Sequence, residues 1–179
     1  KENGYLILNA DDHFYNFHKK LALKRKISIL SFSVKNKSSN IYLNSIKKQK
    51  LKYRVSIAIN NKNRYFYFNT CFENDIKNLL ASIAIVSIYK NINKLDYNFF
   101  YNHKIPSGRG DVSKVKLFKK NFYLIDQSYN SNPLSLNSAL KNFNMIKLND
   151  DKKHLILGDM LELGKYSKKL HTDVFKNIN

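Results

Sequence analysis

The sequence predicts an α/β protein made of two small units, and three observations lead to this prediction. Short continuous apolar runs, typical of strands buried in a parallel sheet, alternate with longer segments that carry apolar residues at helical spacing. Residues 41–68 instead alternate apolar and polar positions, as antiparallel strands do. Pro106-Ser107-Gly108 then interrupts the regular pattern, so we expect one unit over residues 1–106 and another over residues 107–179.

In the first unit, we expect two buried strands, a helix between them, a small antiparallel sheet and a long helix. The apolar runs lie at 5–8 and 27–32, and Phe14, Phe17, Leu21 and Leu23 give the helix between them an apolar face. Asp11 or Asp12 can cap that helix. After a polar loop at 35–40, the remaining predictions are antiparallel strands within 41–68, a long helix over 74–89 and a short one within 94–102.

We expect the second unit to begin with a hairpin, whose strands at 112–118 and 122–126 are joined across 119–121. Within it, residues 123–125 read as a buried strand that leads Asp126 into a polar loop. Asn132 is a good N-cap for the next helix, and Pro133 suits the first helical position. A buried strand at 154–157, ending at Gly158, and a helix over 166–178 complete a partial Rossmann-like α/β unit.

The composition limits the classes of partner. The formal net charge is +19, but nearly all of the positive charge is Lys, and the lysines are scattered from Lys19 to Lys176. Nucleic-acid-binding faces need clustered cations and favour Arg, so we expect no nucleic-acid partner. No apolar stretch is long enough to cross a membrane, and no signal peptide is visible. Cys71 is the single cysteine, so we expect a buried structural thiol and no zinc site.

Two motifs carry a family resemblance. Asp126-Gln127-Ser128-Tyr129-Asn130-Ser131-Asn132-Pro133, followed by the segment 158–164 (Gly-Asp-Met-Leu-Glu-Leu-Gly) and His171, resembles the C-terminal domain of the MurF ligases. These are the UDP-N-acetylmuramoyl-tripeptide:D-alanyl-D-alanine ligases. Asn9-Ala10-Asp11-Asp12, Asn78 and Gly108-Arg109 agree with the resemblance upstream. The sequence departs from the family at Gln127, often an acid, at Ser131, usually Ala, and at Asn74, often His.

The resemblance implies that the chain comprises the C-terminal part of a Mur ligase central ATPase domain, followed by the start of a Rossmann-like C-terminal domain. It implies an ATP-dependent amide ligase of peptidoglycan precursor synthesis that uses ATP and Mg²⁺. Its partners would be UDP-N-acetylmuramoyl-tripeptide and D-alanyl-D-alanine, in a cytoplasmic monomer without stable membrane association. The sequence contains no Gly-x-x-x-x-Gly-Lys-Ser/Thr phosphate loop. In the family this loop and the metal ligands come earlier, so we expect no catalytic or metal-binding residue here and no activity of this chain alone.

The resemblance also assigns candidate site residues. Those for ATP are Asn78 at adenine, Arg109 at a phosphate and Asp126 at the ribose or adenosine, while those for the peptide substrates are Asn130, Asn132, Asp159, Glu162 and His171. Four of these residues have a simpler explanation. Asp126 can hydrogen-bond its own turn, Arg109 can be a surface charge, Asn78 can be an ordinary helix residue, and Asn132 can be only a cap.

Two alternatives stay open at this point. Within the same superfamily, the chain could come from a ligase that adds an amino acid, such as the MurE or folylpolyglutamate type. The segments 129–133 and 158–164 favour the dipeptide-adding type. The alternative from a different class is a basic nucleic-acid-binding module, which would show salt-dependent retention on heparin.

Overall fold

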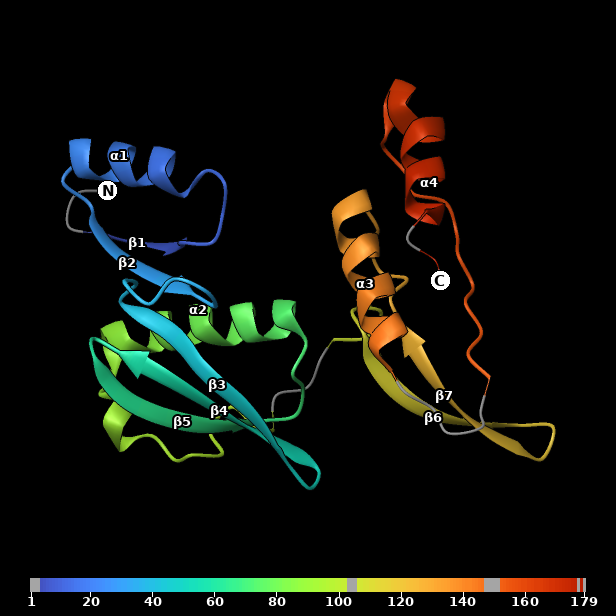
Figure 1. The fold of residues 1–179 in the computed structure, drawn as a ribbon, viewed down its shortest axis with the longest axis horizontal. Coiled ribbons are helices and arrows are strands. Elements are labelled where there is room, and N and C mark those ends of the chain that lie inside the picture. Colours follow the sequence, from blue (N-terminus) through green and yellow to red (C-terminus); the bar gives the residue numbers. More distant parts are fainter. Residues whose placement is uncertain (1–3, 103–105, 147–151, 177, 179) are drawn as a thin grey trace. The chain divides into compact units, whose positions relative to one another are not determined.

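The computed structural model describes residues 4–102, 106–146, 152–176 and 178. The chain divides into two compact units, residues 1–103 and 104–179, and each is described by itself below. Both contain helices and strands, so the predicted α/β class is confirmed (Figure 1). No helix in the described part of the chain is long and apolar enough to cross a membrane.

The first unit is built on a five-stranded mixed sheet with the order β1-β2-β3-β4-β5. The strands are β1 Tyr5–Asn9, β2 Ser28–Ser33, β3 Ile41–Gln49, β4 Lys52–Ile59 and β5 Lys62–Phe68. β1, β2 and β3 pair in parallel, and β3, β4 and β5 pair antiparallel. The predicted strands are therefore confirmed, but the antiparallel strands are not a separate sheet. β3 joins them to the parallel strands through a short pairing with Phe32 and Ser33 of β2.

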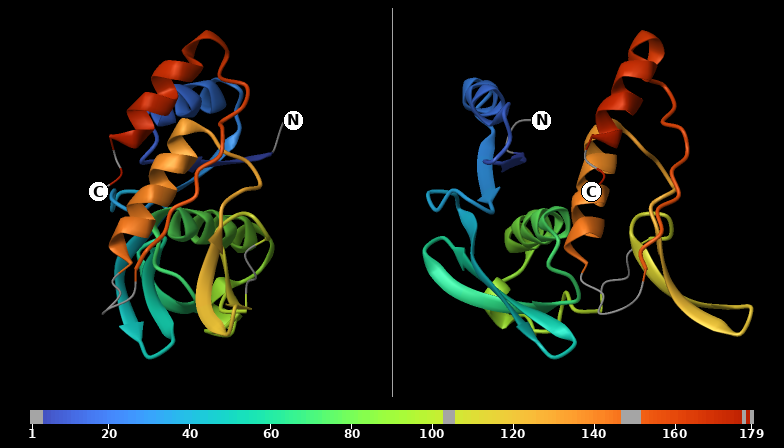
Figure 2. Two further views of the ribbon diagram at one scale, coloured as in Figure 1. Left: turned by 90° about the vertical axis from the view of Figure 1, so that its right-hand side faces the viewer. Right: turned by 45° about the vertical axis from the view of Figure 1, so that its right-hand side comes forward.

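The core of this unit lies between the sheet and helix α2 Glu73–Tyr89, which packs against one sheet face (Figure 2). The fully buried side chains come from both layers: Val55, Ile57 and Phe66 from the strands, and Leu80 and Ile83 from the helix. Since the helix begins at Glu73, Asn78 lies in its second turn. The prediction of a short helix within 94–102 was wrong, because residues 95–102 form bends and turns, and the nearest helical element is a 3-10 turn at Ile92–Lys94.

Helix α1 Tyr15–Lys24 follows β1 as predicted, but its expected apolar face is not buried among the described residues. Ala22 is its buried residue, whereas Phe14, Phe17 and Leu23 are each about 60% exposed. The capping prediction was also wrong, because no side chain caps this helix. The Asp12 carboxylate accepts the N–H of Phe14 in a preceding turn, and Asp11 bonds elsewhere. Helical periodicity indicates which residues share a face, but not whether a neighbouring element covers it.

The second unit begins with the predicted hairpin, formed by β6 Asp111–Leu117 and β7 Lys120–Asp126, although its turn lies at 118–119 and not at the predicted 119–121. Phe118 and Lys119 make its turn, and both have the positive φ that a two-residue hairpin turn of this hand requires. The prediction that residues 123–125 are buried was wrong, since Tyr123 is 73% exposed. A two-stranded ribbon exposes both faces unless another layer covers it, and no described element does so here.

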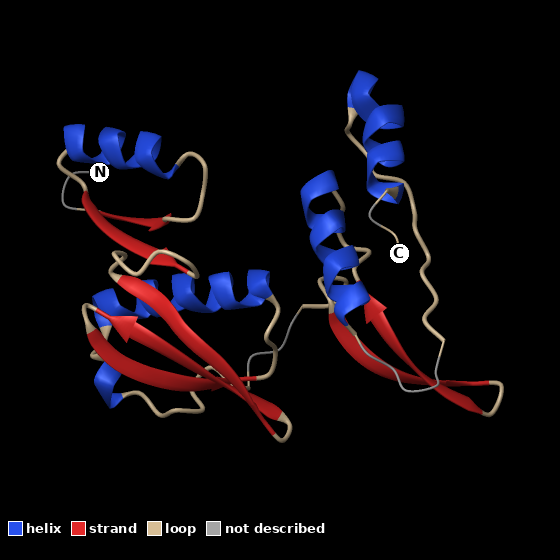
Figure 3. Cartoon of the chain, viewed as in Figure 1, coloured by secondary structure: helices blue, strands red, loops and turns tan. Residues whose placement is uncertain are grey.

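Two helices follow the hairpin, α3 Pro133–Met145 and α4 Ser167–Phe175, with a 3-10 turn at Gly164–Tyr166 before the second. They pack on each other through a small core of Leu140, Met160 and Val174. The buried strand predicted at 154–157 was wrong, because the segment is an extended loop in which Ile156 is 93% exposed (Figure 3). An apolar run becomes a strand only where a neighbour pairs with its backbone, and the described sheet of this unit contains β6 and β7 alone.

Candidate functional site

The polar loop after β7 ends in a reciprocal cap on α3. The Asn132 side chain accepts the backbone N–H of Ser135 at 2.9 Å, and the Ser135 hydroxyl accepts the backbone N–H of Asn132 at 3.0 Å. Pro133 occupies the first turn of the helix, where a missing N–H costs nothing. The predicted cap at Asn132 is therefore confirmed. Its amide oxygen is committed to the helix, which leaves the amide NH₂ to contact a ligand.

Asp126 forms a tight turn at the end of β7. Its Oδ1 accepts the backbone N–H of Ser128 at 2.9 Å, which is the structural explanation considered from the sequence. Hydrogen bonds from the Ser128 side chain and then from its backbone N–H lower the pKa of the Asp126 carboxyl below its ordinary value. Asp126 is therefore ionised at neutral pH. A carboxylate has two oxygens, so the turn leaves acceptor capacity for the hydroxyl of a ligand.

The loop that carries Arg109 lies against the loop that follows Asp126. Tyr129 donates its N–H to the Gly108 carbonyl at 3.1 Å, and Gly110 donates its N–H to the Asp126 carbonyl at 2.6 Å. Gly108 is required here, because it has φ +75° and a Cβ at this position would lie 2.8 Å from Tyr129 Cβ. The two loops are thus held side by side within the second unit.

This packing places the Arg109 guanidinium over the Tyr129 ring, with its Cζ 4.5 Å from the ring centroid. Arg109 is exposed, and stacking on an aromatic face leaves its N–H groups free to bind oxygen atoms. The structure therefore brings together two candidates that are 17 positions apart in sequence, Arg109 and Asp126. Asn130, the next candidate in the loop, is exposed.

The second candidate cluster has a different geometry. His171 Nε2 accepts the N–H of Met160 at 3.0 Å, and its Nδ1 lies 2.8 Å from the Ser167 carbonyl. These partners require a neutral ring with its proton on Nδ1. Because Met160 is in the small core, His171 fastens the segment 159–160 to α4. Asp159 Oδ1 lies 3.9 Å from His171 Nε2, and the Asp159 side chain is 92% exposed.

Glu162 is exposed and has a positive φ of 62°, so it shapes the turn before α4. Asp159 and Glu162 therefore remain accessible, while His171 has a role in positioning the loop that carries Asp159. Across the described residues, no group of three or more His, Cys, Asp or Glu side chains could hold a metal ion.

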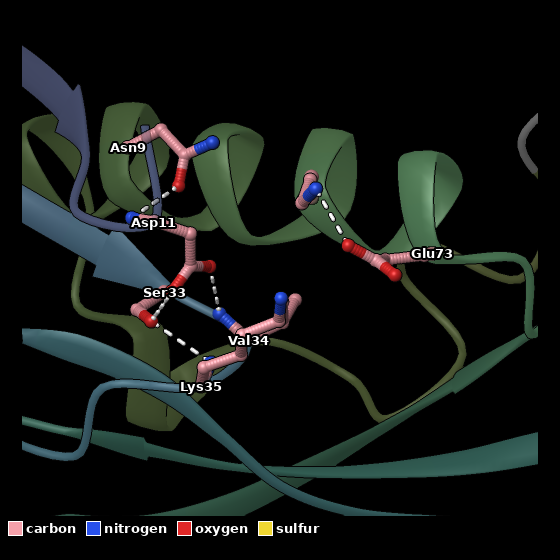
Figure 4. A network of polar contacts seen from close by, with 7 residues as sticks. Asn9, Asp11, Ser33, Val34, Lys35 and Glu73 are labelled. Carbon is pink, nitrogen blue, oxygen red and sulfur yellow. Dashed lines mark hydrogen bonds and ion pairs between the residues drawn. The ribbon is translucent and has the colours of Figure 1, made fainter. Parts of the chain in front are cut away.

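In the first unit, Asn78 is exposed on α2, and its backbone carbonyl accepts the Ser82 hydroxyl at 2.9 Å. A more elaborate polar network lies where β1 and β2 end (Figure 4). The Asp11 carboxylate accepts the hydroxyl of Ser33 and the backbone N–H of Val34, the latter at 2.7 Å. The Ser33 oxygen in turn accepts the N–H groups of residues 35 and 36.

Sequence reasoning missed three contributors to these sites. Asp11 was taken as a helix cap, yet it organises the loop after β2, and nothing in its local sequence indicates a partner 22 positions away. Ser33 was not singled out. Tyr129 was part of a motif but had no role of its own. The glycines on both sides of Arg109 were the available signal for Tyr129, since they indicate close backbone packing.

Comparison with known proteins places residues 1–86 in the Mur ligase middle domain. Over 184 residues, the chain is 29% identical to UDP-N-acetylmuramoyl-tripeptide--D-alanyl-D-alanine ligase of Buchnera aphidicola, covering 100% of this chain and 38% of that protein. It is 25% identical to the protein of the same name from Rickettsia prowazekii, covering 99% of this chain and 38% of the relative. The chain therefore spans less than half the length of these curated relatives.

A solved structure agrees with these matches at the level of the fold. The MurF ligase of Thermotoga maritima, in complex with ADP, superposes with a TM-score of 0.75 at 18% identity. The match covers 99% of this chain and 38% of that one.

Proposed function

We propose that the chain forms part of a MurF-type ligase, since residues 1–86 match the Mur ligase middle domain. It would supply the later part of the ATP-binding middle domain, over residues 1–106, and the beginning of the C-terminal domain, over residues 107–179. The observation that carries this proposal is that two relatives with the same name each match 99% or more of this chain.

The proposed reaction is the ATP-dependent joining of D-alanyl-D-alanine to UDP-N-acetylmuramoyl-tripeptide. The substrate carboxylate attacks the γ-phosphate of ATP, which gives an acyl phosphate and ADP. The amine of the dipeptide then attacks the acyl carbon, and inorganic phosphate leaves as the amide forms. Such an intermediate must be kept from water, which favours an enzyme whose domains close over it.

Within the second unit, we assign nucleotide contacts to Arg109 and Asp126. The guanidinium on Tyr129 is an exposed fork suited to a phosphate, and the Asp126 carboxylate has a free acceptor position for a ribose hydroxyl. Asn78 is the proposed adenine contact of the first unit, where its exposed amide can both donate and accept.

For the peptide substrates, we assign Asn130 and the free amide NH₂ of Asn132, together with Asp159 and Glu162, whose carboxylates suit the amine of a dipeptide. His171 would contribute to binding of the same substrate indirectly, because it holds the segment that carries Asp159 in place. Mg²⁺ would neutralise phosphate charge in the complete ligase. Among the described residues, no group of three or more His, Cys, Asp or Glu side chains could hold it, so we assign no residue of this chain to it.

The experiment is an ADP-release assay on the full-length ligase that we propose contains this chain. With ATP and UDP-N-acetylmuramoyl-tripeptide present, ADP should form on addition of D-alanyl-D-alanine and not on addition of D-alanine, lysine or glutamate. The matched control omits the tripeptide substrate. ADP release that requires a single amino acid would assign the chain to an amino-acid-adding ligase, and no release with any acceptor would refute a ligase.

A further inference from the structure

The antiparallel part of the first-unit sheet gathers positive charge without any acid. Residues 41–68 contain seven basic residues and no Asp or Glu: Lys47, Lys48, Lys50, Lys52, Arg54, Lys62 and Arg64. Along the chain these cations look scattered, but β3, β4 and β5 pair side by side and bring them onto one small sheet. The reason for expecting no polyanion partner, namely the lack of clustering, therefore does not hold for this part of the molecule.

The sheet face opposite α2, called the outer face below, carries the polar half of these strands. Val55 and Phe66 point into the core, so their neighbours Arg54, Ser56 and Tyr65 point the other way. A shallow groove of about 550 Å³ lies on this face. It is lined by Tyr42, Asn44, Arg54, Ser56, Asn63, Arg64 and Tyr65.

Aromatic rings hold the two arginines of the groove. The Cζ of Arg54 lies 4.0 Å from the centroid of the Tyr65 ring, and Tyr65 stacks on Tyr97 at 4.4 Å with the rings 5° from parallel. The Cζ of Arg64 lies 4.9 Å from the Tyr97 centroid, but its Nη2 donates to the Leu95 carbonyl, and it stands opposite Ile57 of the core in the strand register. Two residues further along each of the strands β4 and β5, Lys52 Nζ lies 3.4 Å from the centroid of the Tyr67 ring. The cations are thus fixed in place by stacking.

Their charge is not neutralised within the described part of the chain. The ion pairs found there involve other residues, and the Nε atoms of Arg54 and Arg64 are buried without a hydrogen-bond partner. A buried donor without a partner costs free energy. An anion bound in the groove would offset the positive charge of the guanidinium groups and accept their hydrogen bonds. Stacked guanidinium groups keep their outer N–H groups available for phosphate oxygens.

We propose that the outer face of β3, β4 and β5 binds single-stranded nucleic acid. Arg54 would contact phosphates in the groove, and Lys47 and Lys52 would follow the backbone along the sheet. The Asn44–Asn63 amide pair, joined at 2.9 Å, offers donors and acceptors to base edges. The eight residues of β4 span about 26 Å, which exceeds a single phosphate group and suits a chain of several nucleotides. None of these residues is among the nucleotide contacts proposed for ligation.

The groove favours nucleic acid over an anionic lipid surface, because its lining contains tyrosine, amide and hydroxyl side chains and no large aliphatic side chain. Single-stranded nucleic acid presents planar bases as well as phosphates, and proteins bind it through a basic surface with aromatic side chains. A lipid surface would instead require apolar side chains to enter the acyl region.

The test is fluorescence anisotropy of the 179-residue chain with a fluorescein-labelled oligouridylate of about 12 nucleotides, titrated over a range of salt concentrations. Arg54→Gln removes one groove cation, and Arg25→Gln, at an exposed position away from the outer face, changes the net charge equally. We expect Arg54→Gln to weaken binding about tenfold and to reduce the salt slope by about 0.7, with Arg25→Gln close to the unchanged chain.

A second pair of variants keeps the structure intact. Asn63→Asp places a carboxylate in the groove but retains the Oδ1 that accepts the Asn44 amide, so it should weaken binding at least as much. Asn121→Asp, exposed on the hairpin of the second unit, is its charge-matched control. Equal weakening by groove and control variants would show diffuse attraction and overturn the proposal. So would absence of binding at low salt, or binding to phosphatidylglycerol vesicles without binding to the oligonucleotide.

Discussion

The cap on α3 gives a quantitative prediction about the loop that joins β7 to this helix. Asn132→Ala removes the oxygen that accepts the Ser135 N–H at 2.9 Å, while the reverse bond from the backbone at position 132 to the Ser135 hydroxyl can persist. Both residues are exposed, so water partly replaces the lost partner. We expect a cost of about 1 kcal/mol to the helix, the usual value for a lost N-cap.

The second unit has a small core of Leu140, Met160 and Val174, so a change of this size should be visible in local opening. The assay is hydrogen exchange measured by mass spectrometry on peptides that cover α3. At about 1 kcal/mol, their amides should exchange about fivefold faster in Asn132→Ala. Peptides from the first unit serve as an internal reference, because that unit has its own core.

Asn130→Ala is the matched control, because it makes the same side-chain change at an exposed position two residues before the cap. It should leave the exchange of α3 unchanged. The reasoning would be refuted if Asn132→Ala exchanged at the original rate, or if both variants accelerated exchange alike. Ser135→Ala tests the reciprocal bond, and its effect should not add fully to that of Asn132→Ala, since each residue caps through the other.

Three further predictions concern other contacts. Arg109→Ala in the full-length ligase should raise the KM for ATP or lower kcat about thirtyfold, because it removes a charge-assisted phosphate contact worth about 2 kcal/mol. Unchanged kinetics would mean that Arg109 is only a surface charge. Gly108→Ala should destabilise the second unit in urea denaturation, because the added Cβ meets Tyr129 at 2.8 Å and the backbone has φ +75°; an unchanged midpoint would contradict this packing. A hydrogen bond with Cys71 and, to a smaller extent, burial raise the pKa of Tyr53 above its ordinary value of 10.0. In a ¹³C NMR titration, Tyr53 should therefore ionise at higher pH than free tyrosine, and Cys71→Ala should lower the midpoint of this titration.

Local rules predicted the elements whose causes are local. The Asn132-Pro133 cap, the hairpin and the long helix of the first unit follow from residue types and spacing within a few positions, and all three are present. The strand and helix alternation likewise gave the correct α/β class.

Burial was predicted less well, because it depends on neighbours that no local pattern specifies. Residues 123–125 form a strand but are exposed, and residues 154–157 form no strand, although both runs are apolar enough for a sheet core. The apolar face of α1 is exposed for the same reason. A pattern of side chains indicates what could be buried, and the surrounding elements determine what is.

The candidate sites show the same limit. Arg109 and Asp126 could be named from the sequence, but their proximity depends on two backbone hydrogen bonds and two glycines in a loop that precedes the hairpin. The role of Asp11 depends on Ser33, which follows it only after a helix and a strand. The cation–aromatic stack of the outer face depends on strand register and on a loop that brings Tyr97 beside Tyr65.

A change at Asp126 distinguishes a loop after β7 that binds nucleotide from one that only builds a turn. In Asp126→Asn, the side-chain oxygen that accepts the Ser128 N–H is kept, while the negative charge and one acceptor are lost. An ATP titration of the full-length ligase, beside a thermal melting scan, separates the two roles. We expect the ATP affinity to be about tenfold weaker, with little change in Tm. A lowered Tm with unchanged ATP affinity, measured well below the transition, would contradict it.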